Sequence, residues 1–382
     1  MDKKKILVIN TKYREFGGED SNIIEELNLL KKYFTTEYLE FDNNEKLSFT
    51  DLISFITVNN KKSNRRLLTK LNEFNPDIVY INNTWFKANL GIIKLLNEKK
   101  FPLYLKIHNY RYDCSRYLLS RNHLNGSKLC FKCGFEFKNF KIFNKYYSDS
   151  YFRSLALIIY GKKYFKILKR DISNIFVLNN FHKDFIVKLG IEPEKVHVSY
   201  NPINQIKKEE INFDKTANYV VYAGRIVNEK GIFELIKAWK KSKTQLILKI
   251  IGDGPMRKNL EEEFKSSNIE FLGYLNHDKT MEIIKKCRAT ITATKMYEGQ
   301  PRLLCEASSF GVPSVFPKTG GISEYFPEEY SLSFEQFNNK DLVNKIKLLN
   351  NDEIVNIESH NVYEHINNLI VPNELIQIFE KR

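Results

Sequence analysis

Short apolar runs alternate with amphipathic segments along the first 200 residues. The apolar runs predict buried strands at 5–10, 77–81, 103–107, 174–178 and 196–198. Between them, segments 20–34 and 89–99 carry apolar residues at helical spacing, for example Ile23, Leu27 and Leu30. This alternation predicts an open parallel sheet with helices on both faces.

The alternation pauses in a polar stretch after Asn201-Pro202 and then resumes. The second series predicts strands at 219–223, 245–251, 269–272, 289–293 and 314–316, and helices at 231–241, 256–265, 280–286, 301–310 and 342–349. We interpret the chain as a first domain (1–202), a linker (203–218), a second domain (219–365) and a C-terminal helix (366–382). The predicted fold class is α/β, with two doubly wound, Rossmann-like domains. We expect these domains to face each other across a cleft, because open parallel sheets bind ligands beyond their strand ends. The C-terminal helix is expected to cross back to the first domain.

Composition fits a globular protein of two domains. A chain of 382 residues is long enough for two domains, and 42% hydrophobic with 28% charged residues is typical of a globular protein and not of a disordered one. The first apolar run is too short for a secretory signal, and none approaches the roughly 20 residues of a membrane span. With only five cysteines, we expect a cytoplasmic protein without a disulfide framework.

The net charge of +14 is concentrated in one region: residues 101–170 carry +12 and 17 of the 51 aromatic residues. Such a segment suits nucleic acid or an anionic membrane surface, or is a lysine-rich solvated face beside an aromatic core. No recognised nucleic-acid-binding module is present. Within the region, Cys114, Cys130 and Cys133 with His123 are of the types that bind structural zinc, although their spacing is irregular and buried or free thiols are the more common explanation.

Candidate site residues follow the predicted strands of the second domain. Gly224, Arg225 and Lys230 come after its first strand, where two cations could neutralise a departing diphosphate. The turns Gly252-Asp253-Gly254 and Gly273-Tyr274 follow later strands, and each brings backbone to the same edge, where a base or ribose could bind. Each is also an ordinary tight turn.

Two carboxylates, Glu298 and Glu306, stand eight positions apart around a predicted helix start. Pro301 suits the first helical position, Gly311 suits the stop, and Gly299 and Gln300 lie in the preceding loop. A helix N-terminus suits a phosphate, and a carboxylate on either side can accept hydrogen bonds from sugar hydroxyls.

The first domain offers a weaker set of candidates. Adjacent Gly17 and Gly18 permit close approach of a phosphate or sugar between the first strand and helix. His108 follows a predicted strand and could hydrogen-bond a sugar hydroxyl, although a histidine at a strand end is often structural.

In this order the motifs resemble those of family 4 glycosyltransferases of the GT-B fold, most specifically in residues 222–321. The resemblance implies a nucleotide-diphosphate-sugar donor held mainly by the second domain, an acceptor met by the first, retention of anomeric configuration and no required metal. It implies that Arg225 and Lys230 are catalytic electrophiles, that Glu298 and His108 contact the donor sugar, and that Glu306 contacts the ribose. The remaining donor-binding residues it implies are Gly17, Gly18, Gly224, Gly252, Gly254, Tyr274, Gly299, Gln300 and Pro301.

The region around Ile107 to Arg111, with the cysteines that follow, is similar to a capsule and exopolysaccharide branch of that family. Gln300-Pro301 departs from the Phe-Gly of many members, which leaves the donor sugar open. We therefore expect a glycosyltransferase acting on a lipid-linked saccharide, docked on the inner face of the plasma membrane through residues 135–170. The alternatives are a non-catalytic sugar-nucleotide-binding partner subunit and a basic nucleic-acid-binding protein.

Overall fold

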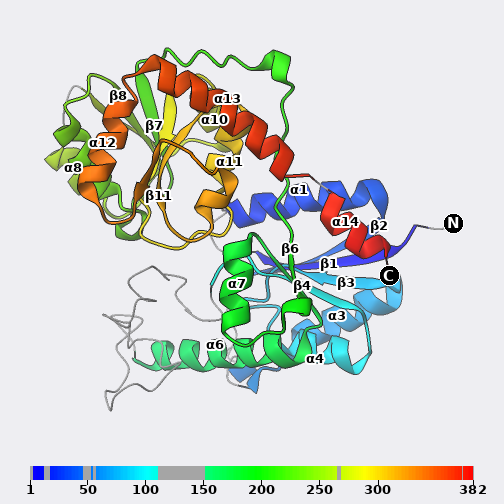
Figure 1. Ribbon diagram of the computed structural model, residues 1–382. Coiled ribbons are helices and arrows are strands. Elements are labelled where there is room, and N and C mark those ends of the chain that lie inside the picture. Colours follow the sequence, from blue (N-terminus) through cyan, green and yellow to red (C-terminus); the bar gives the residue numbers. More distant parts are fainter. Residues whose placement is uncertain are drawn as a thin grey trace. The chain divides into compact units, whose positions relative to one another are not determined.

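The structure, a computed structural model, describes residues 3–12, 18–45, 53–54, 57–110, 151–264, 268–371 and 373–381. The chain divides into two compact units, the first made of residues 1–202 with 372–382 and the second of residues 203–371 (Figure 1). The second unit is therefore inserted, in sequence, between two parts of the first.

The first unit is built on a six-stranded sheet in the order β2-β1-β3-β4-β5-β6, with every neighbouring pair parallel. Its strands are β1 (Lys5–Lys12), β2 (Thr35–Asp42), β3 (Ile78–Ile81), β4 (Leu103–Lys106), β5 (Asn174–Val177) and β6 (Val196–Val198). Its helices are α1 (Gly18–Tyr33), α3 (Lys61–Phe74), α4 (Gly91–Glu98), α6 (Tyr151–Asp171), α7 (Asn180–Lys188) and α14 (Asn373–Glu380). Strands β3, β4 and β5 are buried along their whole length, which is why they read as continuous apolar runs.

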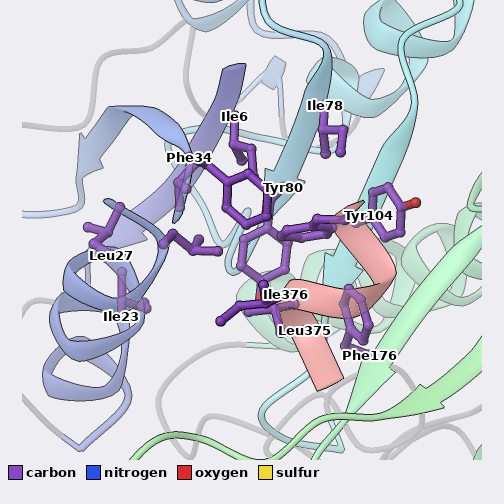
Figure 2. Packing of buried hydrophobic residues seen from close by; sticks show 13 residues of the cluster. Ile6, Ile23, Leu27, Phe34, Ile78, Tyr80, Tyr104, Phe176, Leu375 and Ile376 are labelled. Atoms are coloured by element: carbon purple, nitrogen blue, oxygen red, sulfur yellow. The ribbon is translucent and has the colours of Figure 1, made fainter. Parts of the chain in front are cut away.

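Helix α14 completes the core of the first unit. Its Leu375, Ile376 and Phe379 are buried in one cluster with side chains of α1 and the sheet, and Figure 2 shows Leu375 and Ile376 beside the sheet residues Tyr80 and Tyr104. The Phe379 ring lies edge-on to Tyr104 and Tyr80, with centroids 4.9 Å and 5.4 Å away. The expected return of the C-terminal helix to the first domain agrees with this packing.

A buried ion pair also fastens α1 to this sheet. Lys106 Nζ at the end of β4 lies 2.6 Å from Glu26 Oε1 on α1, and both side chains are almost fully buried. Tyr80 donates its hydroxyl to Glu26 Oε2 at 2.9 Å. Burial and this neighbouring carboxylate raise the pKa of Tyr80, so it remains a donor. Because both charges are paired and hydrogen-bonded, the cost of burying them is largely offset.

The second unit repeats the architecture with the strand order β12-β11-β10-β7-β8-β9, again parallel throughout. Its strands are β7 (Tyr219–Ala223), β8 (Ile247–Ile251), β9 (Ile269–Gly273), β10 (Ala289–Ile291), β11 (Ser314–Lys318) and β12 (Ser333–Glu335). Its helices are α8 (Ile232–Ser242), α9 (Arg257–Glu263), α10 (His277–Lys285), α11 (Arg302–Ser309), α12 (Asn339–Leu348) and α13 (Asp352–Leu369). Figure 1 shows α8 and α12 on one side of this sheet and α10, α11 and α13 on the other.

Each sheet has a point where the strand order reverses. In the second unit β7 is followed along the chain by β8 on one side, whereas β10 pairs with β7 on the other. In the first unit β1 has the corresponding position between β2 and β3. In open parallel sheets the crevice outside such a reversal is the usual ligand site. The loops after β7 and β10 are therefore the expected ligand-binding loops of the second unit.

Some elements differ from the sequence-based expectation. The edge strands β2 and β12 were not expected, because each mixes polar and apolar residues. The boundary expected at residue 366 falls inside α13, which continues to Leu369, and the division between units follows Val371. The stretch expected to be a linker, 203–218, belongs with the second unit, where Lys215 and Tyr363 bond to neighbouring backbone and side chains.

We expect the substitution Phe379→Ala to destabilise the first unit by about 3–5 kcal/mol, because it leaves a cavity among four aromatic rings. The chain has two tryptophans, and Trp85 lies in the first unit and Trp239 in the second, both buried. In a Trp239→Phe background, urea unfolding followed by Trp85 fluorescence reports the first unit alone. The control is Gln377→Ala, an exposed position of the same helix, and equal loss in both variants would contradict the assignment of α14 to this core.

Candidate active site

The loop after β7 carries Arg225 and Lys230, and backbone contacts hold it in place. Gly224 N donates to Ile251 O at 3.0 Å, and Ile226 N donates to Asp253 O at 2.8 Å, so the loop is tied to the end of β8. Arg225 is exposed, and Lys230 is partly buried at the end of a short 3-10 turn, Asn228–Lys230. This places both cations at the carboxyl edge beside the point where the strand order reverses.

Gly231 fixes the position of Lys230 against the next loop. Its φ is +66°, and a Cβ there would lie 1.9 Å from Ala293 O, in the loop that follows β10. In addition, Lys295 N donates to Glu229 O at 2.9 Å. Only glycine allows the loops after β7 and β10 to approach this closely.

Across this contact Lys230 meets the first of the two predicted carboxylates. Lys230 Nζ lies 2.6 Å from Glu298 Oε1, and Thr294 Oγ1 donates to the same oxygen at 3.1 Å. Both partners therefore converge on Oε1, which fixes the carboxylate and leaves it facing the loop edge with about a fifth of its side chain exposed. Thr294 itself is buried, with its carbonyl bonded by Gln336 Nε2.

The second carboxylate, Glu306, lies inside α11 and is nearly buried. Arg302 Nε donates to Glu306 Oε1 at 2.9 Å, and His277 Nε2 of α10 lies 3.5 Å from the same oxygen. Pro301 is not the first helical residue, as the sequence suggested, but precedes the helix as its cap residue with ψ of 81°. Its carbonyl accepts from Cys305 N at 3.0 Å, so Arg302 becomes the first residue of the helix.

The turns after β8 and β9 reach the same edge. Gly252 has a φ of +135°, and a Cβ there would lie 2.0 Å from Gly224 O, so this contact also requires glycine. Gly252 N donates to Gly273 O at 2.8 Å, which joins three strand ends in one row. Tyr274 follows with 76% of its surface exposed. Helix α9 begins at Arg257, one residue after the start expected at 256.

Burial keeps the nearby hydroxyl and thiol groups neutral. Tyr222 donates its hydroxyl to Arg225 O at 2.9 Å, and burial together with Glu298 raises its pKa. Burial, with a smaller effect of Glu306, raises the pKa of Cys305 well above its usual value. A buried neutral thiol is inert, so Cys305 is a packing residue and not a nucleophile.

In the first unit His108 lies directly beyond β4 and Asn82 directly beyond β3. His108 Nε2 and Asn82 Oδ1 are 2.8 Å apart, which requires the proton on that nitrogen. His182 on α7 is fully buried with its ring 4.5 Å from Tyr110. Burial, and secondarily the charge of His108, lowers the pKa of His182 to about 3.

The second unit thus brings together Gly224, Lys230, Gly252, Glu298 and their loops, while Arg225, Tyr274 and Glu306 lie on neighbouring segments of the same unit. His108 belongs to the first unit, Gly18 begins α1, and Gly17 lies outside the described residues. Sequence reasoning missed Thr294, His277 and Arg302. Arg302 could have been found, because an arginine four positions before a glutamate in a helix predicts an ion pair.

Within the described ranges, no group of three or more His, Cys, Asp or Glu side chains is arranged to hold a metal ion. The candidate zinc ligands Cys114, Cys130, Cys133 and His123 all lie outside those ranges. None of the described helices combines the length and apolar composition needed to cross a membrane.

Comparison with known proteins identifies the second unit. Residues 204–367 match the family described as "Glycosyl transferases group 1". The chain is 26% identical over 187 residues to the putative teichuronic acid biosynthesis glycosyltransferase TuaC of Bacillus subtilis, covering 45% of this chain and 46% of that protein. It is 27% identical over 183 residues to the Campylobacter jejuni N-acetylgalactosamine-N,N'-diacetylbacillosaminyl-diphospho-undecaprenol 4-alpha-N-acetylgalactosaminyltransferase, covering 45% and 48%. The chain thus matches about half the length of these relatives.

Solved structures match over the whole chain. HepE of Anabaena, solved with UDP and glucose, superposes with a TM-score of 0.69 at 15% identity, covering 99% of this chain and 100% of that one. Sucrose-phosphate synthase from Thermosynechococcus elongatus gives 0.70 at 13% identity, covering 99% and 98%. At such identities the likeness shows the fold alone, and it confirms the expected GT-B class of two Rossmann-like domains.

The buried His182 predicts an acid sensitivity of the first unit. An unfolded histidine takes up a proton near pH 6.5, whereas His182 takes one up only near pH 3 in the folded state. The unfolded state therefore binds more protons between these values, and stability falls by up to about 1.4 kcal/mol per pH unit as pH decreases. The Phe substitution at His182 keeps a ring against Tyr110 but removes the titration.

We expect the stability of the His182→Phe variant relative to wild type to rise steadily from pH 7 to pH 5. Urea unfolding at each pH, followed by Trp85 fluorescence in the Trp239→Phe background, measures this difference. A difference that stays constant across that range would contradict the buried neutral state of His182.

Proposed function

Because residues 204–367 match the family described as "Glycosyl transferases group 1", we propose that this chain transfers a sugar from a nucleotide-diphosphate-sugar donor to a saccharide acceptor. The observation that carries the proposal is the placement of Arg225, Lys230 and Glu298 on the loops where the second sheet reverses its strand order. Those loops are tied together by glycine contacts that admit no side chain. A site preorganised in this way needs little rearrangement during the reaction.

In the proposed reaction the two cations and Glu298 have different roles. The bond between the anomeric carbon and the diphosphate oxygen breaks, and negative charge builds on the departing diphosphate. Arg225 and Lys230 stabilise that charge. Glu298, oriented by Thr294 and Lys230 through Oε1, accepts hydrogen bonds from the donor sugar.

Retention of configuration is part of this proposal. The acceptor hydroxyl attacks on the face from which the diphosphate leaves, and its proton passes to a departing phosphate oxygen. This route needs no protein base. His108 of the first unit is assigned to positioning of the donor sugar.

We further assign the chain to surface polysaccharide synthesis on a lipid-linked acceptor. The Campylobacter relative is named for transfer to a diphospho-undecaprenol-linked saccharide, and TuaC is named for teichuronic acid biosynthesis. HepE was solved with UDP and glucose, which supports a nucleotide-sugar donor. Zinc binding by the cysteine cluster stays a prediction.

A lipid-linked acceptor requires the enzyme to reach the cytoplasmic membrane surface, and α6 is the described part of the basic segment predicted to dock there. Its Tyr160, Tyr164 and Leu168 are buried, four residues apart, whereas Lys162, Lys166, Lys169 and Arg170 are exposed. Residues 135–150 of the predicted docking segment lie outside the described residues. Each basic residue near an anionic surface contributes about 1 kcal/mol of attraction.

The first test replaces Arg225 or Lys230 by alanine. We expect each change to reduce the transfer rate roughly 100- to 1,000-fold, because an electrophile facing the leaving group is lost. The measurement is transfer from a nucleotide sugar, chosen by a thermal-shift screen, to a lipid-diphosphate-saccharide acceptor.

The matched control is Lys241→Ala, an exposed lysine in the last turn of α8, away from the carboxyl edge of the sheet. Near-normal turnover in both active-site variants would refute the leaving-group assignment. Donor binding without any transfer or donor hydrolysis by wild type would favour the non-catalytic partner subunit instead.

The second test reverses the charge of Lys162, Lys163 and Lys166. Co-sedimentation with vesicles of neutral phosphatidylcholine, with and without anionic phosphatidylglycerol, should show lipid-dependent binding of wild type that falls roughly 100-fold in the variant. Reversal of Lys3, Lys31 and Lys32 makes the same change in net charge on exposed lysines elsewhere in the first unit. Binding that does not depend on anionic lipid, or equal losses in both variants, would exclude α6 as the docking surface.

A further inference from the structure

We propose that Arg302 and His277 are positioning residues that hold Glu306 for the donor ribose, and that they make the enzyme select ribonucleotide donors over 2′-deoxyribonucleotide donors. The inference rests on the proposed function, since it requires a nucleotide sugar and a ribose at Glu306.

The first observation is the convergence of two side chains on one oxygen. Arg302 Nε and His277 Nε2 lie 2.9 Å and 3.5 Å from Glu306 Oε1. The Arg302 and Glu306 side chains are only 14% and 11% exposed, so their pairing is only weakly screened by water. Helices α10 and α11, which carry them, are packed in one apolar cluster with β7.

The second observation is that Arg302 stands where a helix disfavours a cation. It is the first residue of α11, and no side chain caps that end. The partial positive charge of a helix N-terminus opposes a guanidinium there, so the position itself does not favour arginine. The ion pair with Glu306 one turn later offsets this unfavourable interaction with the helix dipole. We therefore assign Arg302 the role of holding that carboxylate.

A carboxylate held in this way is a selective partner for a diol. Arg302 and His277 both hold Glu306 at Oε1. Because that oxygen is anchored, the carboxylate has little freedom to move toward a new partner when a ligand lacks one hydroxyl, and that hydrogen bond is lost. Sites built to hydrogen-bond a hydroxyl discriminate strongly against analogues without it, because the protein group is left unpaired.

The test measures ribose discrimination and not activity. Isothermal titration compares the pairs UDP and 2′-deoxy-UDP, GDP and 2′-deoxy-GDP, ADP and 2′-deoxy-ADP, and CDP and 2′-deoxy-CDP. Wild type should bind the ribonucleotide of its preferred base roughly 10- to 100-fold more tightly than the deoxy form. In Arg302→Met this ratio should fall to within roughly threefold, through weaker ribonucleotide binding.

Further variants separate positioning from a general loss of structure. Arg302→Lys keeps the charge but not the planar donor, and it should restore part of the ratio. His277→Asn should reduce the ratio less than Arg302→Met, since His277 is the more exposed and more distant partner. The matched control is Lys208→Met, which removes the cation of another ion pair of the second unit, with Glu364 on α13, and should leave the ratio unchanged.

Two results would overturn this inference and leave the proposed function standing. One is equal affinity of wild type for the ribonucleotide and its 2′-deoxy form, and the other is a wild-type affinity ratio in Arg302→Met. Failure of all eight nucleotides to bind overturns the proposed function, and this inference with it.

Discussion

The close approach of backbones at the carboxyl edge of the second sheet is the constraint on which its site depends. Gly231 touches the carbonyl of Ala293, and Gly252 touches that of Gly224, at distances that exclude any side chain. Because these contacts join the loops after β7, β8 and β10, they set the separation of Lys230 and Glu298 before any ligand arrives. The ion pair follows from the backbone geometry and does not create it.

Each of the two site carboxylates is held by two side chains at one oxygen, although the two differ in burial. Glu298 is held by Lys230 and Thr294, and Glu306 by Arg302 and His277, in each case through Oε1. Lys230 reaches Glu298 from another loop, whereas Arg302 lies one turn before Glu306 on α11. Charge compensation within the protein allows several ionised groups to share one edge of a sheet without strong mutual repulsion.

Much of the fold was predictable because buried parallel strands leave a simple pattern. Strands β3, β4 and β5 are buried throughout and read as apolar runs, whereas the edge strands β2 and β12 mix polar and apolar residues and gave no clear signal. The order of Gly224, Arg225, Lys230, Glu298 and Glu306 was informative because strand-end loops meet at one edge. Thr294 and His277 escaped notice, since their role depends on tertiary contacts between segments far apart in the sequence.

The insertion of the second unit between two parts of the first has a consequence for synthesis on the ribosome. Residues 1–202 leave the exit tunnel first, yet Leu375, Ile376 and Phe379, which fill their core, follow the whole second unit. The earlier half must therefore wait, with apolar surface on Tyr80, Tyr104 and Phe176 uncovered, while the later half is translated and folds. The second unit therefore completes its fold before the first unit, although its residues are translated later. A chaperone would meet the first unit, not the second, in an incomplete state.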